Sequence, residues 1–235
     1  MYDDAARFYD VIHEARGRDA AAEADLVTGE ARRLAPASNT LLDVGCGTGA
    51  HLPRFAETFD VVGVDLSAPM LTLAAERAPS VVLVEGDFRT FALDRRFDVA
   101  VSLFSGIGYL TELDDLRTAI SNVAAHLNPR GVLLIEGWVE PEYWRGSTVH
   151  SESGRAGELA VARASRSSRT GTQCEIEMRY TAATSEAITT VDERHTMRIS
   201  DPDEFADAYA AAGLSFARLP HMLHTGRSVY AGVKS

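Results

Sequence analysis

The fold of this chain is decided by the stretch Leu41-Leu42-Asp43-Val44-Gly45-Cys46-Gly47-Thr48-Gly49-Ala50. It is an apolar run that ends in three alternating glycines and leads directly into a helix-like segment. A strand that is buried on both faces needs such a run, and glycines let the backbone turn tightly and approach a ligand closely. The pattern predicts the first strand and the ligand loop of a Rossmann-like domain.

A second strand that ends in an acid strengthens this prediction. Residues 60–65 form another apolar run, and Asp65 lies about 20 residues past Gly45, where nucleoside-binding sheets place the carboxylate that accepts the ribose hydroxyls. The glycine spacing is G-x-G-x-G, which differs from the dinucleotide pattern and by itself is also compatible with an ordinary strand-to-helix turn. The loop and the acid together predict a nucleoside site.

These motifs resemble those of the class I S-adenosylmethionine-dependent methyltransferases. The glycine loop, Val64-Asp65-Leu66-Ser67 and Glu85-Gly86-Asp87-Phe88 occur in the family's order. The resemblance implies S-adenosylmethionine (SAM) as the cofactor, and a loop without a phosphate cradle at a helix start favours SAM over a nicotinamide cofactor. The expected cofactor contacts are Gly45, Gly47 and Gly49 at the methionine part, Asp65 at the ribose, Asp87 and Phe88 at the adenine, and also Asp43, Cys46, Leu66, Met70 and Gly86.

The whole chain is similar to bacterial N-methyltransferases that dimethylate the amino group of nucleotide-linked deoxyaminosugars for antibiotic assembly. The residues that carry this similarity are 16–19, 103–110, 163–165 and 226–227. It implies a dTDP-linked amino sugar as the small-molecule acceptor, and a homodimer. It also implies that Tyr9, Arg16 and Phe104 contact the cofactor, that Phe104 and Ser105 edge the methyl site and that Arg227 meets the nucleotide phosphates. Tyr109 and Trp138 are candidate contacts near the sulfonium and the acceptor on cation–π grounds, with core packing as the alternative. Arg163 is a candidate phosphate contact, with a solvated strand face as the alternative. The alternative is an O- or N-methyltransferase of another small natural product.

An amine must lose a proton before it can attack a methyl group, so a base is expected near the acceptor. The candidates for catalysis are His195, His13 and Tyr9, with His195 first, although most histidines of a chain are simply solvated. His221 and His224 are also expected near the cleft, whereas His51 and His126 fall in helices and are interpreted as structural.

The order of elements predicts an α/β fold with a seven-stranded, Rossmann-like methyltransferase sheet. Residues 2–35 carry a helical period that is interrupted at Gly17, and strands and helices alternate from Leu41 onward. Between residues 140 and 200 the period changes, and alternation over 159–165, 174–181 and 188–199 predicts three inserted antiparallel strands after the fifth strand. The expected organisation is a core of residues 1–139 and 201–235, with a substrate cover at 140–200.

Composition excludes several classes of protein. The formal net charge of −11 works against binding to nucleic acid, and 46% hydrophobic residues supply a continuous core. Cys46 and Cys174 are expected to be free thiols in a reducing compartment, and without a Cys/His cluster no metal site is expected. An acidic N-terminus and the lack of an apolar run near the ~20 residues of a membrane span predict a cytoplasmic protein without a membrane partner.

Overall fold

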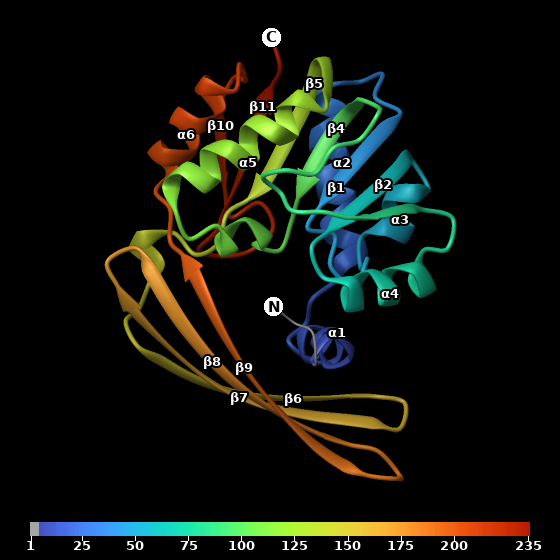
Figure 1. Ribbon diagram of the computed structural model, residues 1–235, viewed down its shortest axis with the longest axis vertical. Helices are drawn as coiled ribbons and strands as arrows, with labels where there is room; N and C mark the ends of the chain where they lie inside the picture. The colour runs from blue at the N-terminus through green and yellow to red at the C-terminus, as the bar shows by residue number, and fades with distance from the viewer. Residues whose placement is uncertain (1–4) are drawn as a thin grey trace.

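The computed structural model describes residues 5–235 and contains two β-sheets (Figure 1). The chain enters through helices α1 (Ala6–Ala15) and α2 (Ala20–Leu34), and Gly17 between them has φ of +83°. The predicted break at Gly17 is therefore confirmed. The first residues of the helical prediction, 2–4, lie outside the described part of the chain.

The larger sheet has seven strands in the order β10-β11-β5-β4-β1-β2-β3. The strands from β1 to β5 run parallel, and β11 is antiparallel to both of its neighbours. This topology confirms the predicted Rossmann-like sheet. The bounds are β1 Thr40–Val44, β2 Asp60–Asp65, β3 Val82–Glu85, β4 Phe97–Ser102, β5 Leu127–Glu136, β10 Ala217–Pro220 and β11 Ser228–Val233.

Helices cover both faces of this sheet, and each face has its own core. One core joins the sheet to α5 and α6 through residues such as Ile120 and Tyr209, and the other joins it to α2, α3 and α4 through residues such as Val27 and Phe55. Both cores bury apolar side chains, and this burial stabilises the fold by roughly 25 cal/mol for each Å² of apolar surface that is removed from water. The bounds are α3 Leu52–Ala56, α4 Ala68–Arg77, α5 Leu113–Ala125 and α6 Pro202–Ala211, with short 3-10 turns η1 (Gly106–Tyr109) and η2 (Pro141–Tyr143).

The second sheet has four antiparallel strands, where the sequence predicted three. The additional strand is β6 (Thr148–Ala156), most of whose residues are exposed and polar, so it lacks the apolar alternation that reveals the other three. The remaining strands are β7 Leu159–Thr170, β8 Gln173–Ala183 and β9 Ile188–Arg198.

Helix α1 lies between the two sheets (Figure 1). Its Phe8 and Ile12 pack against Val161 and Tyr180 of the second sheet. A Cβ at Gly154 on β6 would collide with the backbone of α1, so this strand approaches the helix closely. Helix α1 therefore connects the four-stranded sheet to the edge of the core where the parallel strands end. No helix within residues 5–235 is long and apolar enough to cross a bilayer.

Candidate active site

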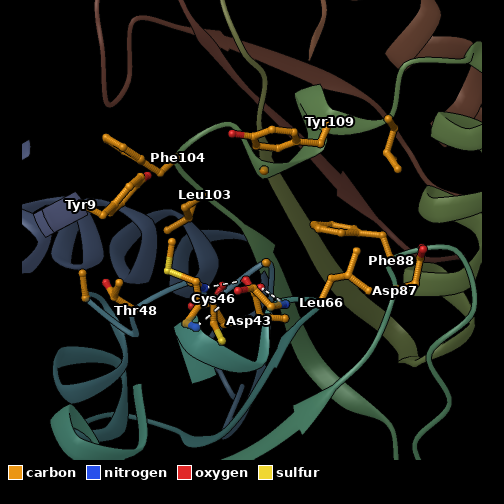
Figure 2. A pocket seen from close by; sticks show the side chains of 18 of the residues that line it. Tyr9, Asp43, Cys46, Thr48, Leu66, Asp87, Phe88, Leu103, Phe104 and Tyr109 are labelled. Carbon is orange, nitrogen blue, oxygen red and sulfur yellow. Dashed lines mark hydrogen bonds between the residues drawn. The ribbon is translucent and has the colours of Figure 1, made fainter. Parts of the chain in front are cut away.

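A cavity of about 250 Å³, called here the first cavity, lies at the carboxyl ends of β1, β2 and β4. Figure 2 shows Asp43 and Cys46 on one side of it and Tyr9, Phe104 and Tyr109 on the other. Ligands of open α/β sheets bind at this edge. Of the expected cofactor contacts, the lining contains Tyr9, Asp43, Gly45, Cys46, Gly47, Asp65, Leu66, Met70, Asp87, Phe88 and Phe104.

The glycine loop and Asp65 form one hydrogen-bonded unit. The backbone N–H of Gly47 donates to Asp65 Oδ2 at 2.8 Å, and the N–H of Ser67 donates to Oδ1 at 2.8 Å. Gly45 and Gly47 have φ of +75° and +56°, a region that glycine enters without strain. A Cβ at Gly47 would meet no atom within 4 Å, so the loop leaves room for a ligand beside the carboxylate.

Two of the expected glycines do not line the first cavity. A Cβ at Gly49 would lie 2.9 Å from the Cβ of Ala74, and a Cβ at Gly86 would lie 2.8 Å from the Cβ of Phe91. Both glycines therefore permit close packing between elements of the core. Their role in this structure is to hold the loop and β3 in place, and the cofactor contact that the resemblance implied does not follow from their positions.

Asp43 is the most deeply buried acid of the first cavity. Burial, reinforced by the nearby charge of Asp65, raises the pKa of Asp43 to about 7. Among the described residues, its Oδ2 atom has no hydrogen-bond partner. An unsatisfied buried acceptor beside open backbone suits a ligand that brings a cation or an N–H donor, as the methionine part of SAM does.

Arg18 lines the first cavity, and Arg16, which the sequence favoured, does not. The guanidinium of Arg18 lies 3.7 Å from the ring centroid of Phe104 and 3.4 Å from Glu23. Arg16 is half exposed and lies 3.8 Å from Glu152 of the second sheet. The left-handed turn at Gly17 redirects the chain between the two arginines, so that Arg18 lines the first cavity and Arg16 lines the second. The contact of Arg16 with the cofactor stays a prediction.

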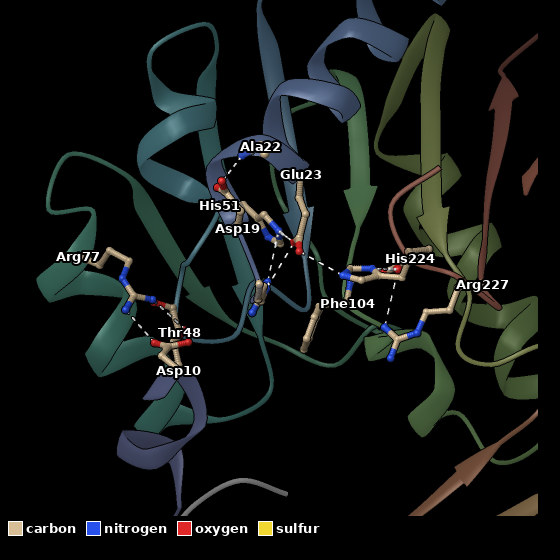
Figure 3. Close-up of polar contacts among 12 residues, drawn as sticks. Asp10, Asp19, Ala22, Glu23, Thr48, His51, Arg77, Phe104, His224 and Arg227 are labelled. Atoms are coloured by element: carbon tan, nitrogen blue, oxygen red, sulfur yellow. Dashed lines mark hydrogen bonds and ion pairs between the residues drawn. The ribbon is translucent and has the colours of Figure 1, made fainter. Parts of the chain in front are cut away.

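Helix α1 is attached to the glycine loop by a polar contact that Figure 3 shows. Thr48 Oγ1 donates to Asp10 Oδ1 at 2.9 Å, and Arg77 of α4 donates to Asp10 Oδ2 at 2.7 Å and to the carbonyl of Thr48 at 3.0 Å. This contact fixes α1 over the loop. It thereby positions Tyr9, the residue before Asp10 in the helix, in the lining of the first cavity.

A second cavity of about 430 Å³ adjoins the first and shares Tyr9, Phe104 and Tyr109 with it. It lies between α1, the second sheet and the loop that precedes β11, and it contains the predicted acceptor residues Ser105, Tyr109, Trp138, Arg163 and Arg227. Its described lining also includes arginines in unusual number for a chain with a net charge of −11. They are Arg16, Arg145, Arg163, Arg166 and Arg227, against the single carboxylate of Glu152.

The candidate bases differ in their surroundings. The hydroxyl of Tyr109 lies 2.9 Å from Nδ1 of His195, and Nε2 of His195 lies 3.1 Å from Glu193. His13 is also buried in the second cavity, but burial and the charge of Arg163 lower its pKa to about 2. His13 is therefore neutral and binds a proton only weakly, which makes it a poor base. The pair Tyr109 and His195 is the better placed candidate for the base.

Sequence reasoning missed the buried acids near Phe104 and the position of His51, whereas it placed His13 and His224 near the cleft. His51, interpreted as structural, lines the first cavity and lies 2.7 Å from Glu23. Glu136 accepts the backbone N–H of Phe104 and lies 2.5 Å from His224. Glu136 did carry a signal in the sequence, because β5 is an apolar run that ends on an acid, as β2 does at Asp65.

The glycine loop, the acid that ends β2 and the adjoining cavity together define a SAM-dependent methyltransferase. The sequence pattern of a family described as Methyltransferase domain matches residues 41–131. A SAM-bound amino pentose methyltransferase of Micromonospora echinaspora, involved in calicheamicin biosynthesis, superposes with a TM-score of 0.87, at 36% identity over 97% of both chains. The crystal structure of DesVI of Streptomyces venezuelae gives a TM-score of 0.93, at 36% identity over 99% of both chains.

Two curated relatives match over nearly their full length. The dTDP-3-amino-3,6-dideoxy-alpha-D-glucopyranose N,N-dimethyltransferase of Streptomyces fradiae is 38% identical over 97% of this chain and 90% of its own length. The dTDP-3-amino-3,4,6-trideoxy-alpha-D-glucopyranose N,N-dimethyltransferase of Streptomyces venezuelae is 37% identical over 99% of both. The chain belongs to the family of dTDP-amino-sugar N,N-dimethyltransferases.

Proposed function

We propose that this methyltransferase transfers methyl groups from SAM to the amino group of a nucleoside-diphosphate-linked deoxyaminosugar, as an enzyme of antibiotic biosynthesis. The observation that carries the proposal is the second cavity, where five arginines face one carboxylate. A pyrophosphate is a dianion whose oxygens match the planar donors of guanidinium groups. The names of the curated relatives support the same acceptor class.

The three shared aromatic residues divide the two cavities and would set the path of transfer. Bound SAM supplies a methyl group on a positively charged sulfur, which is the electrophile of the reaction. The rings of Tyr9, Phe104 and Tyr109 would exclude water and stabilise the positive charge on the sulfur of SAM. Their position between the cavities aligns the acceptor amine with the methyl group, and such alignment is a large part of the catalysis of a displacement.

We infer that Tyr109 and His195 remove the proton of the acceptor amine. The ammonium form of the acceptor would give a proton to the Tyr109 hydroxyl oxygen, while the hydroxyl proton passes to His195 Nδ1 over the 2.9 Å contact. The neutral amine then uses its free electron pair for attack on the methyl carbon. Glu193, at 3.1 Å from Nε2, would stabilise the imidazolium that forms.

The domain organisation, the oligomeric state and the location of the protein are proposed from its sequence. Residues 140–200, with the four-stranded sheet, are proposed to be the substrate cover over a core of residues 1–139 and 201–235. A homodimer, a cytoplasmic location and the lack of nucleic-acid and membrane partners stay predictions as well.

The proposal is tested with two acceptors that differ only in the nucleotide. Purified enzyme is incubated with SAM and either dTDP-3-amino-3,6-dideoxyglucose or the free amino sugar, and products are followed by mass spectrometry. We expect one and then two methyl groups on the nucleotide-linked acceptor, with kcat/KM about 100-fold or more above that of the free sugar, because charge-assisted contacts are lost without the pyrophosphate. Equal rates on both acceptors would contradict the proposal.

A further inference from the structure

A histidine links two buried carboxylates beside the second cavity (Figure 3). His224 Nδ1 lies 2.5 Å from Glu136 Oε1, and His224 Nε2 lies 3.2 Å from Glu23 Oε1. The three residues come from the loop before β11, from the end of β5 and from α2, so the contact joins segments that are far apart in the sequence. Both carboxylate side chains are at least nine-tenths buried.

Two buried acids need a positive partner, because an unpaired charge in the interior is strongly unfavourable. The hydrogen bonds to Glu136 and Glu23 raise the pKa of His224 to about 9, so the ring is an imidazolium at neutral pH. Burial opposes the ionisation of Glu23, but its contacts with His224 and His51 outweigh burial and lower its pKa well below the ordinary value. The ring of His224 therefore supplies charge to both acids.

Arg227 competes for the same oxygen of Glu136. Its Nη1 lies 3.7 Å from Glu136 Oε1, which is beyond hydrogen-bonding distance. Among residues 5–235, this buried nitrogen has no hydrogen-bond partner. The Arg227 side chain lines the second cavity, and its guanidinium lies 5.6 Å from the ring centroid of Phe104. An arginine that is this close to an acid would ordinarily close a tight ion pair.

We propose that His224 is a positioning residue that occupies Glu136 and so keeps the guanidinium of Arg227 available to the pyrophosphate of the acceptor. Without the imidazolium, Glu136 would keep only the backbone N–H of Phe104 and the longer contact with Arg227, and the guanidinium of Arg227 would turn toward it. The guanidinium would then leave the second cavity. This inference rests on the proposed function, since it takes the acceptor to be a nucleoside diphosphate derivative.

The test measures binding of dTDP by isothermal titration calorimetry to the natural chain and to three variants. His224→Gln removes the positive charge and keeps an amide donor. We expect it to bind dTDP about tenfold or more weakly, close to Arg227→Ala, because a charge-assisted contact is lost in both. The double variant His224→Gln/Glu136→Gln also removes the charge that attracts Arg227, and we expect it to recover most of the natural affinity.

The outcomes separate this inference from the proposed function. Failure of the natural chain to bind dTDP would contradict the acceptor class and this inference together. Natural affinity in His224→Gln would contradict the positioning role alone. A double variant as weak as His224→Gln would also contradict it, because a general loss of structure at residue 224 is not repaired by a second substitution.

Discussion

Glu136 Oε2 accepts a hydrogen bond of 2.6 Å from the backbone N–H of Phe104. Phe104 and the following Ser105 have φ of +55° and +68°, a conformation that costs a residue with a side chain about 1–3 kcal/mol. The acid at the end of β5 thus holds the end of β4 in a strained turn. The turn places the Phe104 ring where the two cavities meet.

Replacing Glu136 tests this support. We expect Glu136→Ala to lower the free energy of unfolding by about 1–3 kcal/mol, since a buried N–H loses its acceptor. Glu136→Gln should lower the free energy of unfolding by less, because its amide oxygen can still accept the hydrogen bond from the Phe104 N–H. Urea unfolding measures both values, and equal losses in the two variants would show that the hydrogen bond is not the source of stability.

The two arginines that flank Gly17 should differ in their effect on SAM. Arg18→Ala removes a cation that lines the first cavity, so we expect the Kd for SAM to rise about tenfold. Arg16→Ala removes a half-exposed cation that faces Glu152, so the Kd should stay unchanged. Isothermal titration with SAM compares the pair, and the reverse ranking would restore Arg16 as the cofactor contact.

The proton path predicts a loss of turnover without a loss of cofactor affinity. In Tyr109→Phe the hydroxyl that contacts His195 is removed while the ring remains, and we expect kcat to fall about 100-fold. The kcat of His195→Asn should fall by a similar factor, whereas the Kd for SAM should be unchanged in both variants. Steady-state kinetics as a function of pH measure kcat for both variants. A Tyr109→Phe variant with the kcat of the natural chain at every pH would contradict the proton path.

The charge of His224 predicts a fall in stability at alkaline pH. The pKa of this ring is raised from 6.5 to about 9 in the folded chain, so its contribution is complete below pH 6.5 and decreases as the pH rises toward 9. The neighbouring Glu23 stays ionised over that range, because its contacts with His224 and His51 lower the pKa of its carboxyl.

The measurement is the melting temperature between pH 7.5 and 9. The buried Asp43 and His13, with pKa values of about 7 and about 2, add only a small slope above pH 7.5, and this slope is the same in the natural chain and in His224→Gln. Burial raises the pKa of the Cys46 and Cys174 thiols, so the stability of both chains decreases toward pH 9. We expect the melting temperature of the natural chain to fall more steeply across this range than that of His224→Gln. Parallel curves would show that another group titrates.

Local patterns of sequence predicted the sheet and the cofactor loop, because each is written in consecutive residues. The apolar runs that lead to Asp43 and Asp65 predicted the strands β1 and β2 and their order along the chain. Strand β6 was missed because an exposed strand has no hydrophobic alternation to show. The sequence also did not indicate that Arg18 lines the first cavity, because only the left-handed turn at Gly17 decides which of the two arginines faces it.

The remainder of the site depends on contacts between distant segments. Glu23, Glu136 and His224 meet only once α2, β5 and the loop before β11 are in place. Likewise, Tyr109 and His195 come together because β9 packs beside η1, and no spacing in the sequence encodes this. Sequence reasoning could therefore name several members of the site without showing how they are paired.

A crystal structure of the enzyme with S-adenosylhomocysteine and dTDP tests the central claim most directly. We expect the adenosyl group in the first cavity with its ribose hydroxyls on Asp65, and the pyrophosphate in the second cavity against Arg227. An adenosyl group that does not contact Asp65, or a pyrophosphate bound away from the arginines, would contradict it.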